Sequence, residues 1–407
     1  MSIKRFVSLL LVLPCIAALA LCGCNGAVTE GKNADIYGSE VSFEGEAHDL
    51  RVMFVNVGKA DCAVVDVDGC VWLIDTGTEE SFVNTYSALA ALGVEKLTGI
   101  IVTHEHEDHV GGLENILYKY PVSTVYYPSY LMSSIEIQSV IDAAEGVSAV
   151  TVAAGDSITA APGVEFNVLA PEKQLTNDDN DNSLVLKFTV NGRSFLFTGD
   201  MQTAEEGVLL ASGTDVKADV LKVGNHGNKD ATSKEFAEAV SPLIAVISTD
   251  TSVDANSANG VVKSHLSMAD IFTTQDTELG VLLTVSRKGE ISVSYPERTA
   301  ASEASKQVSV TAASKADQIF TVTNSGSDEV DISGWFVYST KGCEVFIYPE
   351  DTVIAPGGSV TVACRKSSLV DSADIVWDKK KIWADSKEDI AVLCDQNGNE
   401  LSRLTSK

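Results

Sequence analysis

Basic residues are scarce in this chain of 407 residues. Lys and Arg number 29 against 57 Asp and Glu, which gives a formal net charge of −28. A field of this sign repels polyanions, so bulk charge disfavours tight non-specific nucleic-acid binding unless a local basic strip reverses it. No CxxC spacing occurs, which excludes the usual zinc ribbon and thiol redox motifs. No internal period typical of a solenoid is present either.

Long apolar runs are also missing, apart from residues 6–21 near the N-terminus. A helix needs about 20 apolar residues to cross a bilayer, so this shorter run is typical of a signal peptide. It ends in Leu21-Cys22-Gly23-Cys24, which resembles a bacterial lipoprotein signal. Residues 1–24 are therefore predicted to be the signal, with Cys24 as the lipidated residue of an extracytoplasmic, membrane-anchored protein. An ordinary cleaved signal or an uncleaved anchor is the alternative.

Residues 25–47 are polar and lack periodicity, which predicts a tether. Five cysteines lie beyond the signal, an odd number for a protein outside the cytosol. Cys62 and Cys70 flank a turn at Asp68-Gly69, and they are interpreted either as a disulfide across a hairpin or as buried free thiols.

Residues 48–296 alternate strand-like runs rich in Val, Ile and Phe with amphipathic stretches. The predicted strands are 50–57, 63–67, 71–74, 98–103, 164–169, 184–190, 194–198, 219–223, 243–248, 281–285 and 290–294. The predicted helices are 80–92, 113–120, 135–144, 203–211 and 233–240. Such alternation predicts a layered α/β domain.

The composition changes at residues 297–306, which contain no apolar residue larger than Ala and are predicted to be a linker. Residues 307–407 then predict an all-β domain, since short apolar runs alternate with turn signals. The expected strands are 319–323, 335–339, 344–347, 359–363 and 390–394. Trp335 is expected in the core of this β-sandwich.

Three of the six histidines lie in Thr103-His104-Glu105-His106-Glu107-Asp108-His109. This segment follows a predicted strand and precedes Gly111-Gly112, so its side chains lie on a loop above a rigid sheet. His104 and His106 can face one metal ion, and Asp108 and His109 a second, because imidazole and carboxylate at this spacing suit zinc or similar cations. The alternative is a solvated acidic loop with incidental histidines.

Two more predicted strands end in candidate ligands. Asp200 closes Phe197-Thr198-Gly199-Asp200, where a carboxylate can bridge two metal ions, and His226 closes Lys222-Val223-Gly224-Asn225-His226. His48 lies in the polar N-terminal region and is interpreted as incidental.

Taken in order, these motifs resemble the metallo-β-lactamase superfamily, and most closely the soluble domain of ComEC-type competence proteins and their stand-alone relatives. The resemblance covers about residues 50–295 and implies an αββα sandwich with metal-dependent hydrolase activity. It implies that His104 and His106 bind one divalent ion, that Asp108, His109 and His226 bind another, and that Asp200 lies between them. Zinc is the expected metal, with manganese as the second choice.

The same resemblance implies a substrate and a mechanism. A hydroxide activated by the two ions would attack a phosphodiester, with nuclease-like activity on DNA or RNA. The alternatives are another ester, such as a teichoic-acid phosphoester, a lactone or a thioester, or a non-catalytic surface binding protein that kept the fold.

One departure concerns the first metal ion. Most members of the superfamily place a further histidine ligand in a region where this chain has none, between residues 110 and 225. Asn182 occupies the corresponding place with Asp181 beside it, so both are candidate contacts to the first metal or to substrate. The first site is therefore expected to be the weaker one, although competence proteins often carry Asp where this chain has His106.

Several further residues have two interpretations. Asp61 is either a catalytic acid or partner of a metal ligand, or it stabilises a turn. Asp75 is expected to orient a metal-binding histidine, and His265 either protonates the leaving group or has a structural role at a helix start. Lys222 and Lys229 near His226 are expected to receive a phosphate-rich substrate, against ordinary solvation.

The C-terminal part carries a second resemblance. Asn324-Ser325-Gly326, Asp331-Ile332-Ser333-Gly334-Trp335 and Pro356-Gly357-Gly358 resemble a lamin-tail domain. This implies an immunoglobulin-like sandwich that targets the protein or binds a cell-surface polymer. Lys379-Lys380-Lys381 could touch a polyanion, although a solvated loop is the ordinary interpretation.

Overall fold

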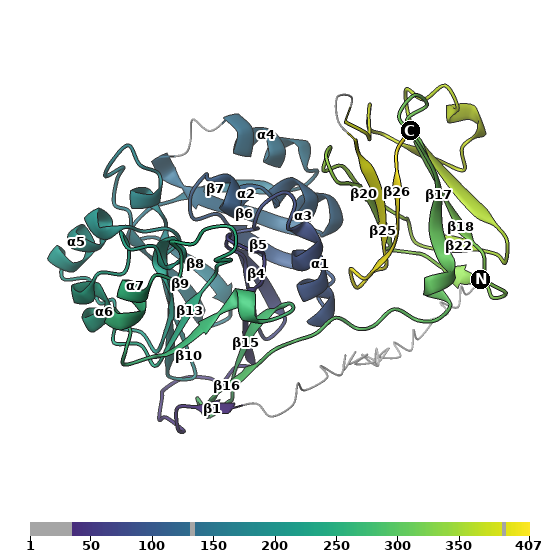
Figure 1. Ribbon diagram of the computed structural model, residues 1–407. Helices are drawn as coiled ribbons and strands as arrows, with labels where there is room; N and C mark the ends of the chain where they lie inside the picture. Colours follow the sequence, from purple (N-terminus) through teal and green to yellow (C-terminus); the bar gives the residue numbers. More distant parts are fainter. Residues whose placement is uncertain (1–34, 131–134, 385–387) are drawn as a thin grey trace, which may run out of the picture.

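The computed structural model describes residues 35–130, 135–384 and 388–407, so the predicted signal and Cys24 lie outside the described residues. The N-terminal domain consists of two β-sheets packed face to face, with helices on both outer surfaces (Figure 1). This confirms the predicted αββα sandwich. Among the described residues, no helix is both long enough and apolar enough to cross a membrane.

The first sheet has nine strands in the order β1-β16-β15-β2-β3-β4-β5-β6-β7. Its strands are β1 (Asp35–Tyr37), β2 (Leu50–Val55), β3 (Ala63–Val67), β4 (Cys70–Ile74), β5 (Leu97–Ile101), β6 (Val122–Pro128), β7 (Ser148–Val152), β15 (Gly280–Val285) and β16 (Ile291–Ser294). Strands β4 to β7 run parallel, and the remaining neighbours are antiparallel.

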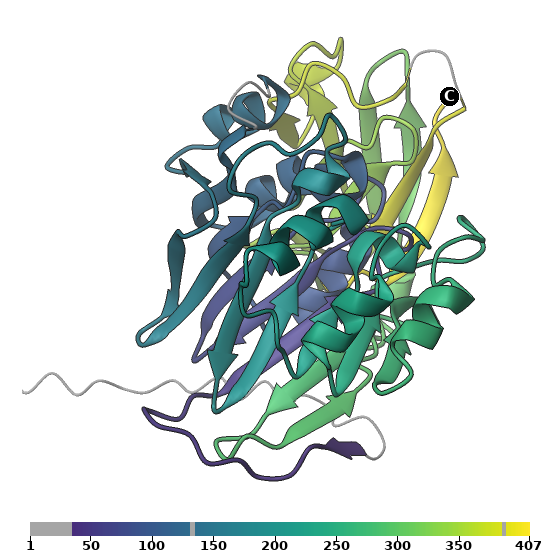
Figure 2. The same cartoon turned by 90° about the vertical axis from the view of Figure 1, so that its left-hand side faces the viewer.

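The second sheet has seven strands in the order β14-β13-β12-β11-β10-β9-β8. Its strands are β8 (Ser157–Ala161), β9 (Val164–Ala170), β10 (Val185–Val190), β11 (Arg193–Phe197), β12 (Val220–Lys222), β13 (Ile244–Ile247) and β14 (Asp270–Thr273). Strands β11 to β14 are parallel to one another. Figure 2 looks onto the helices α5 to α7, with the strands of the sheets behind them.

Seven helices flank the sheets in the described residues. They are α1 (Phe82–Ala91), α2 (Glu107–Val110), α3 (Leu113–Lys119), α4 (Ile135–Ala143), α5 (Thr203–Ala211), α6 (Lys234–Val240) and α7 (Gly260–His265). The first four lie by the first sheet, and α5 to α7 cover the second.

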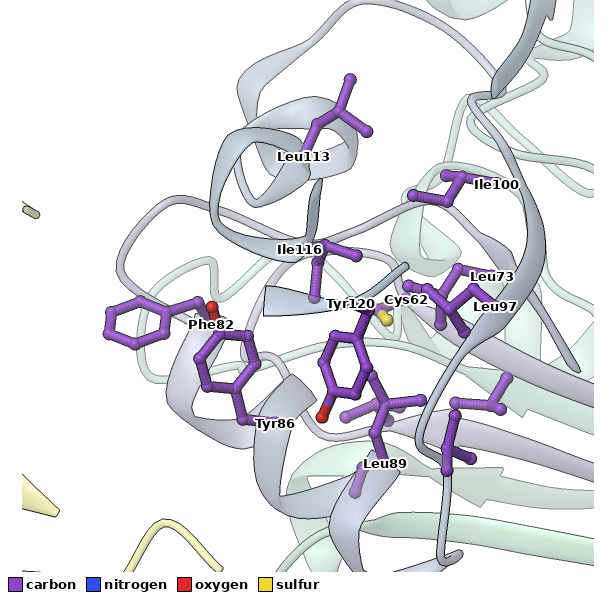
Figure 3. Close-up of a cluster of buried hydrophobic side chains, with 14 of the residues drawn as sticks. Cys62, Leu73, Phe82, Tyr86, Leu89, Leu97, Ile100, Leu113, Ile116 and Tyr120 are labelled. Atoms are coloured by element: carbon purple, nitrogen blue, oxygen red, sulfur yellow. The ribbon is translucent and has the colours of Figure 1, made fainter. Parts of the chain in front are cut away.

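Strand β2 shows why the central strands read as nearly continuous apolar runs. Its alternate residues Val52 and Phe54 face the second sheet, while Met53 and Val55 face the helices, and all four are buried. A strand covered on both faces needs apolar side chains in both directions. On the helical side, Phe82, Tyr86 and Leu89 of α1 and the α3 side chains pack over β4 and β5 (Figure 3).

The C-terminal domain is a β-sandwich with an immunoglobulin-like arrangement, as predicted. Its sheets have the orders β17-β18-β23-β24 and β21-β20-β25-β26, with β19-β22 as a short ladder beside them. The strands are β17 (Val308–Ser314), β18 (Ile319–Asn324), β19 (Val330–Asp331), β20 (Phe336–Ser339), β21 (Val345–Ile347), β22 (Val353–Ile354), β23 (Ser359–Cys364), β24 (Ile375–Trp377), β25 (Ile390–Cys394) and β26 (Glu400–Thr405). Trp335, Trp377 and Trp383 are all buried in its core.

The two domains share an apolar contact. The Phe336 ring lies 5.5 Å from the Tyr86 ring and 6.0 Å from the Phe82 ring, between centroids. The segment between the domains is also held, because Arg298 donates hydrogen bonds to Ser87 Oγ and to Asn84 Oδ1 on α1. Figure 1 shows the sandwich beside α1, on the side away from α5 to α7.

The tether prediction is wrong for residues 35–47. β1 pairs with the outer edge of β16, Val41 N donates to Lys288 O, and Arg193 donates to Ser39 O. An edge strand offers unpaired backbone groups, and a polar segment can satisfy them whatever its side chains are.

The cysteine alternatives are also resolved. Cys62 and Cys70 are both free thiols. The hairpin register pairs Cys70 with Val67, and Cys62 lies beyond the first pair of that ladder. Burial raises the pKa of Cys62 to about 12, which keeps the thiol protonated and unreactive.

Phe336→Ala is expected to destabilise the protein by roughly 3–5 kcal/mol and to separate the unfolding of the two domains, since the ring fills the contact with α1. Calorimetry should then show two transitions in place of one. Val353→Ala, at a side chain that is 44% exposed, is the control and should unfold as the wild type does. An unchanged single transition in the Phe336 variant would contradict this account.

Candidate metal centre

The candidate site lies where strands of both sheets end at one edge. Asp75 follows β4, the His104–His109 segment follows β5, Asp200 follows β11 and His226 follows β12. Because the carboxyl ends of parallel strands meet at one edge, four segments far apart in sequence converge there. This topology explains why each candidate ligand follows an apolar run.

Two glycines permit the close approach of these loops. A Cβ at Gly199 would lie 2.9 Å from Ser183 Cβ and 3.0 Å from Thr103 Cβ, and its φ of +48° is left-handed. A Cβ at Gly112 would lie 2.4 Å from the Thr76 carbonyl oxygen. Glycine is therefore required in the Phe-Thr-Gly-Asp segment and after the histidine motif.

Asp108, His109, Asp200 and His226 form the larger of two such groups among the described residues, with one ligand atom from each within 4.8 Å of the others. His109 Nε2 lies 3.3 Å from Asp200 Oδ1, and His226 Nε2 lies 3.2 Å from both Asp200 Oδ2 and Asp108 Oδ2. Both imidazoles are fully buried. The predicted ligands of the second metal thus lie together.

These atoms lie close together but do not form hydrogen bonds of acceptable geometry with one another. His109 Nε2, His226 Nε2 and Asp200 Oδ1 are buried and have no hydrogen-bond partner of acceptable geometry among the described residues. Buried polar atoms are almost always paired, so such a convergent set requires another partner. A divalent cation fits, because imidazole nitrogen and carboxylate oxygen are ligands of zinc and similar metals.

The hydrogen bond at Nδ1 of each imidazole determines that Nε2 is the nitrogen available to a metal ion. His109 Nδ1 lies 2.8 Å from Asp75 Oδ2, and His226 Nδ1 lies 3.0 Å from the Ser248 carbonyl oxygen. Both acceptors require a proton on Nδ1, so in the neutral rings Nε2 carries the lone pair that a metal would bind. Asp75 is itself held by Thr103, which donates from N and from Oγ1. Its orienting role, as predicted from the sequence, agrees with this geometry.

His104 and His106 lie next to this group and form a poorer set. His104 Nε2 is 3.1 Å from His106 Nδ1, so the two nitrogens face one another as ligands of one ion would. His104 is buried, whereas His106 is half-buried. His104 Nδ1 lies 3.2 Å from Thr103 Oγ1 and 3.4 Å from Ser183 Oγ, and Ser183 Oγ accepts a hydrogen bond from Asp200 N.

The structure contradicts the prediction that Asn182 contacts the first metal or the substrate, whereas that prediction for Asp181 stays untested. The Asn182 amide accepts from Leu175 N and donates to the carbonyl oxygens of Thr176 and Asp178, so it holds its own loop. Asp181 accepts a hydrogen bond from the backbone N–H of Glu205 at the start of α5. Sequence reasoning missed Ser183 by one position, because a hydroxyl gives no ligand signal.

Asp61 and Lys222 form an ion pair beneath the histidines. Lys222 Nζ lies 2.5 Å from Asp61 Oδ2 and also donates to Val223 O, and both side chains are buried. Asp61 Oδ1 is 3.5 Å from His226 Nδ1. The prediction that Lys222 binds substrate is therefore wrong, because its ammonium group already contacts the Asp61 carboxylate and the Val223 carbonyl oxygen. Asp61 faces the Nδ1 side of His226, which suits a partner of a ligand better than a catalytic acid.

His265 and Lys229 are not part of the cluster of candidate ligands. His265 is the last residue of α7, so the helix-start interpretation is wrong, and its Nδ1 donates to Thr232 O at 2.9 Å. This hydrogen bond ties His265 to the segment before α6 rather than to a candidate ligand. Lys229 is exposed. Their roles toward a leaving group and a phosphate stay predictions.

A groove of about 610 Å³ opens beside His106. Its lining is apolar and acidic and comprises Val110, Leu113, Ile137, Val140, Glu105, Glu107, Glu114, Asp179, Gly111 and His106. Among the described residues, no Lys or Arg side chain lines it. A molecule in this groove would reach the candidate metal centre through His106.

The charges of the cluster shift its protonation. Burial alone would lower the pKa of His226, but the negative charge of Asp200 and the contact with Asp108 raise it to about 9. The pKa of His109 is raised for a similar reason, against the effect of burial, by Asp200 and Asp75. Burial opposes ionisation of Asp200, yet the two imidazoles hold its pKa well below the usual range.

Asp75→Asn is expected to weaken zinc binding by roughly 10- to 100-fold, because the amide no longer fixes the Nδ1 proton of His109. Zinc competition with a chromophoric chelator measures this. Asp66→Asn is the matched control, a buried aspartate paired instead with Arg51, and it should bind zinc as the wild type does. Equal zinc affinities in both variants would refute the orienting role.

Zinc affinity is expected to rise at least about tenfold per pH unit as the pH approaches the His226 pKa of about 9, because the metal displaces that proton. Stability of the metal-free protein should change in the opposite sense. The raised pKa of His226 stabilises the folded state in full when the pH is below 6.5, the ordinary pKa of histidine. This stabilisation is lost as the pH rises toward 9. Zinc titrations and urea unfolding across this range test both trends, and a pH-independent zinc affinity would contradict them.

Comparison with known families agrees with both domains. Residues 55–251 match the model described as the metallo-beta-lactamase superfamily, and residues 300–407 match the lamin tail domain. Among solved structures, zinc-bound PqqB from Methylobacterium extorquens is similar at 11% identity and a TM-score of 0.40, covering 55% of this chain and 86% of that one. A diphosphatase of the PhnP family is similar at 14% identity and a TM-score of 0.35, covering 55% and 94%.

Three curated relatives share the first domain. ComE operon protein 3 of Bacillus subtilis is 36% identical over 39% of this chain and 21% of its own length. Competence protein ComA of Neisseria gonorrhoeae is 29% identical over 59% of this chain and 33% of its own length. Recombination protein 2 of Haemophilus influenzae is 28% identical over 49% of this chain and 24% of its own length. The chain thus spans between a fifth and a third of the length of these relatives. It joins a metallo-β-lactamase superfamily domain of the ComEC type to a C-terminal lamin tail domain.

Proposed function

We propose that this protein is a metal-dependent phosphodiester hydrolase with nuclease-like activity, held outside the cytoplasm by a lipid on Cys24. The observation that carries the hydrolase part is the set of unpaired buried atoms on His109, His226 and Asp200 beside an open groove. Domains of this superfamily include metal-dependent hydrolases, and the ligand set here is nearly complete.

Each residue has a role in this proposal. His104 and His106 would hold one divalent ion, Asp108, His109 and His226 another, and Asp200 would lie between them. When bound, such ions lower the pKa of water and polarise a phosphoryl oxygen. Zinc is the expected metal, with manganese as the second choice. The larger and better buried ligand set predicts that the site of His109 and His226 fills first.

The rest of the chain prepares this site. Asp75 and the Ser248 carbonyl keep the Nδ1 protons in place, so that His109 and His226 present Nε2. Ser183 ties the Asp200 backbone to His104. His265 would donate a proton to the leaving group from Nε2, because its Nδ1 is taken by Thr232 O.

Two observations bear on the substrate. The names of two relatives refer to competence and to recombination, which favours DNA or RNA. The acidic groove and the net charge of −28 favour a second candidate, a phosphoester of a surface polymer that carries amino groups, as some teichoic acids do. The lamin tail domain would bind such a polymer. Lys379 is engaged by Glu114 and Glu344, so it is a poor site for a polyanion.

A substrate panel on zinc-loaded protein tests the proposal. We expect hydrolysis of bis-p-nitrophenyl phosphate and of single-stranded DNA or RNA, and no hydrolysis of a lactone or of nitrocefin. His106→Ala should lower the rate by about 100-fold, because a ligand of the first metal is lost. His48→Gln, at a buried histidine that contacts Asp68, is the matched control and should keep full activity.

Two results would overturn it. Inertness toward every phosphodiester would exclude the phosphodiesterase, and failure to bind metal would leave only a binding protein. Preference for an amino-bearing teichoic acid over DNA and RNA would establish the second candidate instead.

A further inference from the structure

Lys59 lies at the entrance of the metal centre, where it contacts the candidate ligand Asp108. It belongs to the loop between β2 and β3, directly after Gly58, whose φ of +81° turns the chain. Its Nζ lies 2.8 Å from Asp108 Oδ2, and its side chain is 26% exposed. The ammonium therefore bridges solvent and a candidate ligand.

The ammonium occupies the same oxygen that the metal centre needs. Asp108 Oδ2 is also the oxygen 3.2 Å from His226 Nε2, on the side where the candidate ligands converge. A divalent ion bound to that oxygen would lie beside the ammonium, and two cations at such a distance repel each other. Binding of a metal to Asp108 should therefore displace the Lys59 head group.

The neighbouring carboxylates are not available to the displaced ammonium group of Lys59. Asp61 is already paired with Lys222, and Asp200 lies deeper, 2% exposed between the two imidazoles. Lysine carries its charge on a flexible stem and can reorient toward solvent. An anion that approaches the metal ions from outside would meet this ammonium first.

We propose that Lys59 is the anion-binding residue of the site: it pairs with Asp108 in the metal-free protein and contacts the substrate phosphate once a metal ion binds Asp108. The inference rests on the proposed function, because it assumes an anionic substrate. Lys59 would then determine the specificity of the site for phosphate esters over neutral esters.

The surroundings make such a residue necessary. Glu105, Glu107 and Asp179 line the adjacent groove, and the formal net charge is −28. A phosphate near these carboxylates is repelled unless a local cation offsets them. Lys222 is buried and engaged, so it cannot serve.

A purely structural role predicts something different. The candidate ligands that are most deeply buried are fixed by buried partners, such as Asp75 for His109. Lys59 contributes a single hydrogen bond from a partly exposed side chain. If it served only to orient Asp108, its removal would weaken metal binding rather than strengthen it.

Three variants test the proposal in the full chain: Lys59→Met, Lys59→Arg and the control Lys288→Met. Lys288 forms an exposed ion pair of the same 2.8 Å length with Glu40, in the β15–β16 turn. Zinc affinity is measured with a competing chelator, and binding of inorganic phosphate to zinc-loaded protein by calorimetry. Both readouts are independent of activity.

Lys59→Met should bind zinc roughly three- to tenfold more tightly, because no ammonium must be displaced from Asp108. The same variant, loaded with zinc, should bind inorganic phosphate about tenfold more weakly, while Lys59→Arg keeps phosphate binding. Lys288→Met should match the wild type in both measurements.

Weaker or unchanged zinc binding in Lys59→Met would overturn the displacement, and unchanged phosphate binding would overturn the anion-binding role. The KM for bis-p-nitrophenyl phosphate should rise in this variant, while hydrolysis of a neutral ester such as p-nitrophenyl acetate should not change. If no phosphodiester is cleaved but zinc and phosphate respond as expected, the proposed function fails and the role of Lys59 stands.

Discussion

The rest of the N-terminal domain depends on one constraint: several ionisable side chains are buried from solvent at the shared edge of the two sheets. Asp200 faces His109 and His226 at 3.3 and 3.2 Å, and none of the three side chains is more than 2% exposed. Burying isolated charges costs several kcal/mol each, so such a group persists only if the charges are paired or bound to a metal. Each additional contact around the site serves this requirement.

The supporting contacts come in layers. Asp75 and the Ser248 carbonyl hold the imidazoles from behind, and Thr103 holds Asp75. Beneath them, the pair of Asp61 and Lys222 places one compensating positive charge in the interior. Lys59 supplies another on the solvent side. The ligands therefore lie between two lysines, one buried permanently and one that can move.

The lamin tail domain is coupled to this site through the helical layer. Its Phe336 packs on α1, and Lys379 pairs with Glu114, which lines the groove beside His106. A domain packed this way cannot swing freely, because an apolar ring would be exposed to water. These contacts therefore hold the orientation of the C-terminal domain relative to the groove.

Sequence reasoning picked out the candidate ligands because each one follows a strand and histidine is rare in this chain. It also located the two domains and Trp335, since apolar periodicity depends on local order. It missed the strands β1, β6, β7, β8 and β14 of the first domain and β17, β19, β22, β24 and β26 of the second. In β7 (Ser148–Val152) and β8, small residues weaken the pattern.

What the sequence by itself determined is therefore the set of candidate ligands, the strands that carry them and the class of both domains. Only the tertiary structure decided which lysine is buried and which is exposed, because Lys222 and Lys59 are alike until Asp61 and Asp108 are placed beside them. It also decided that Ser183 rather than Asn182 approaches His104. Neighbouring residues on a turn point in different directions, and the contacts across the sheet edge select between them.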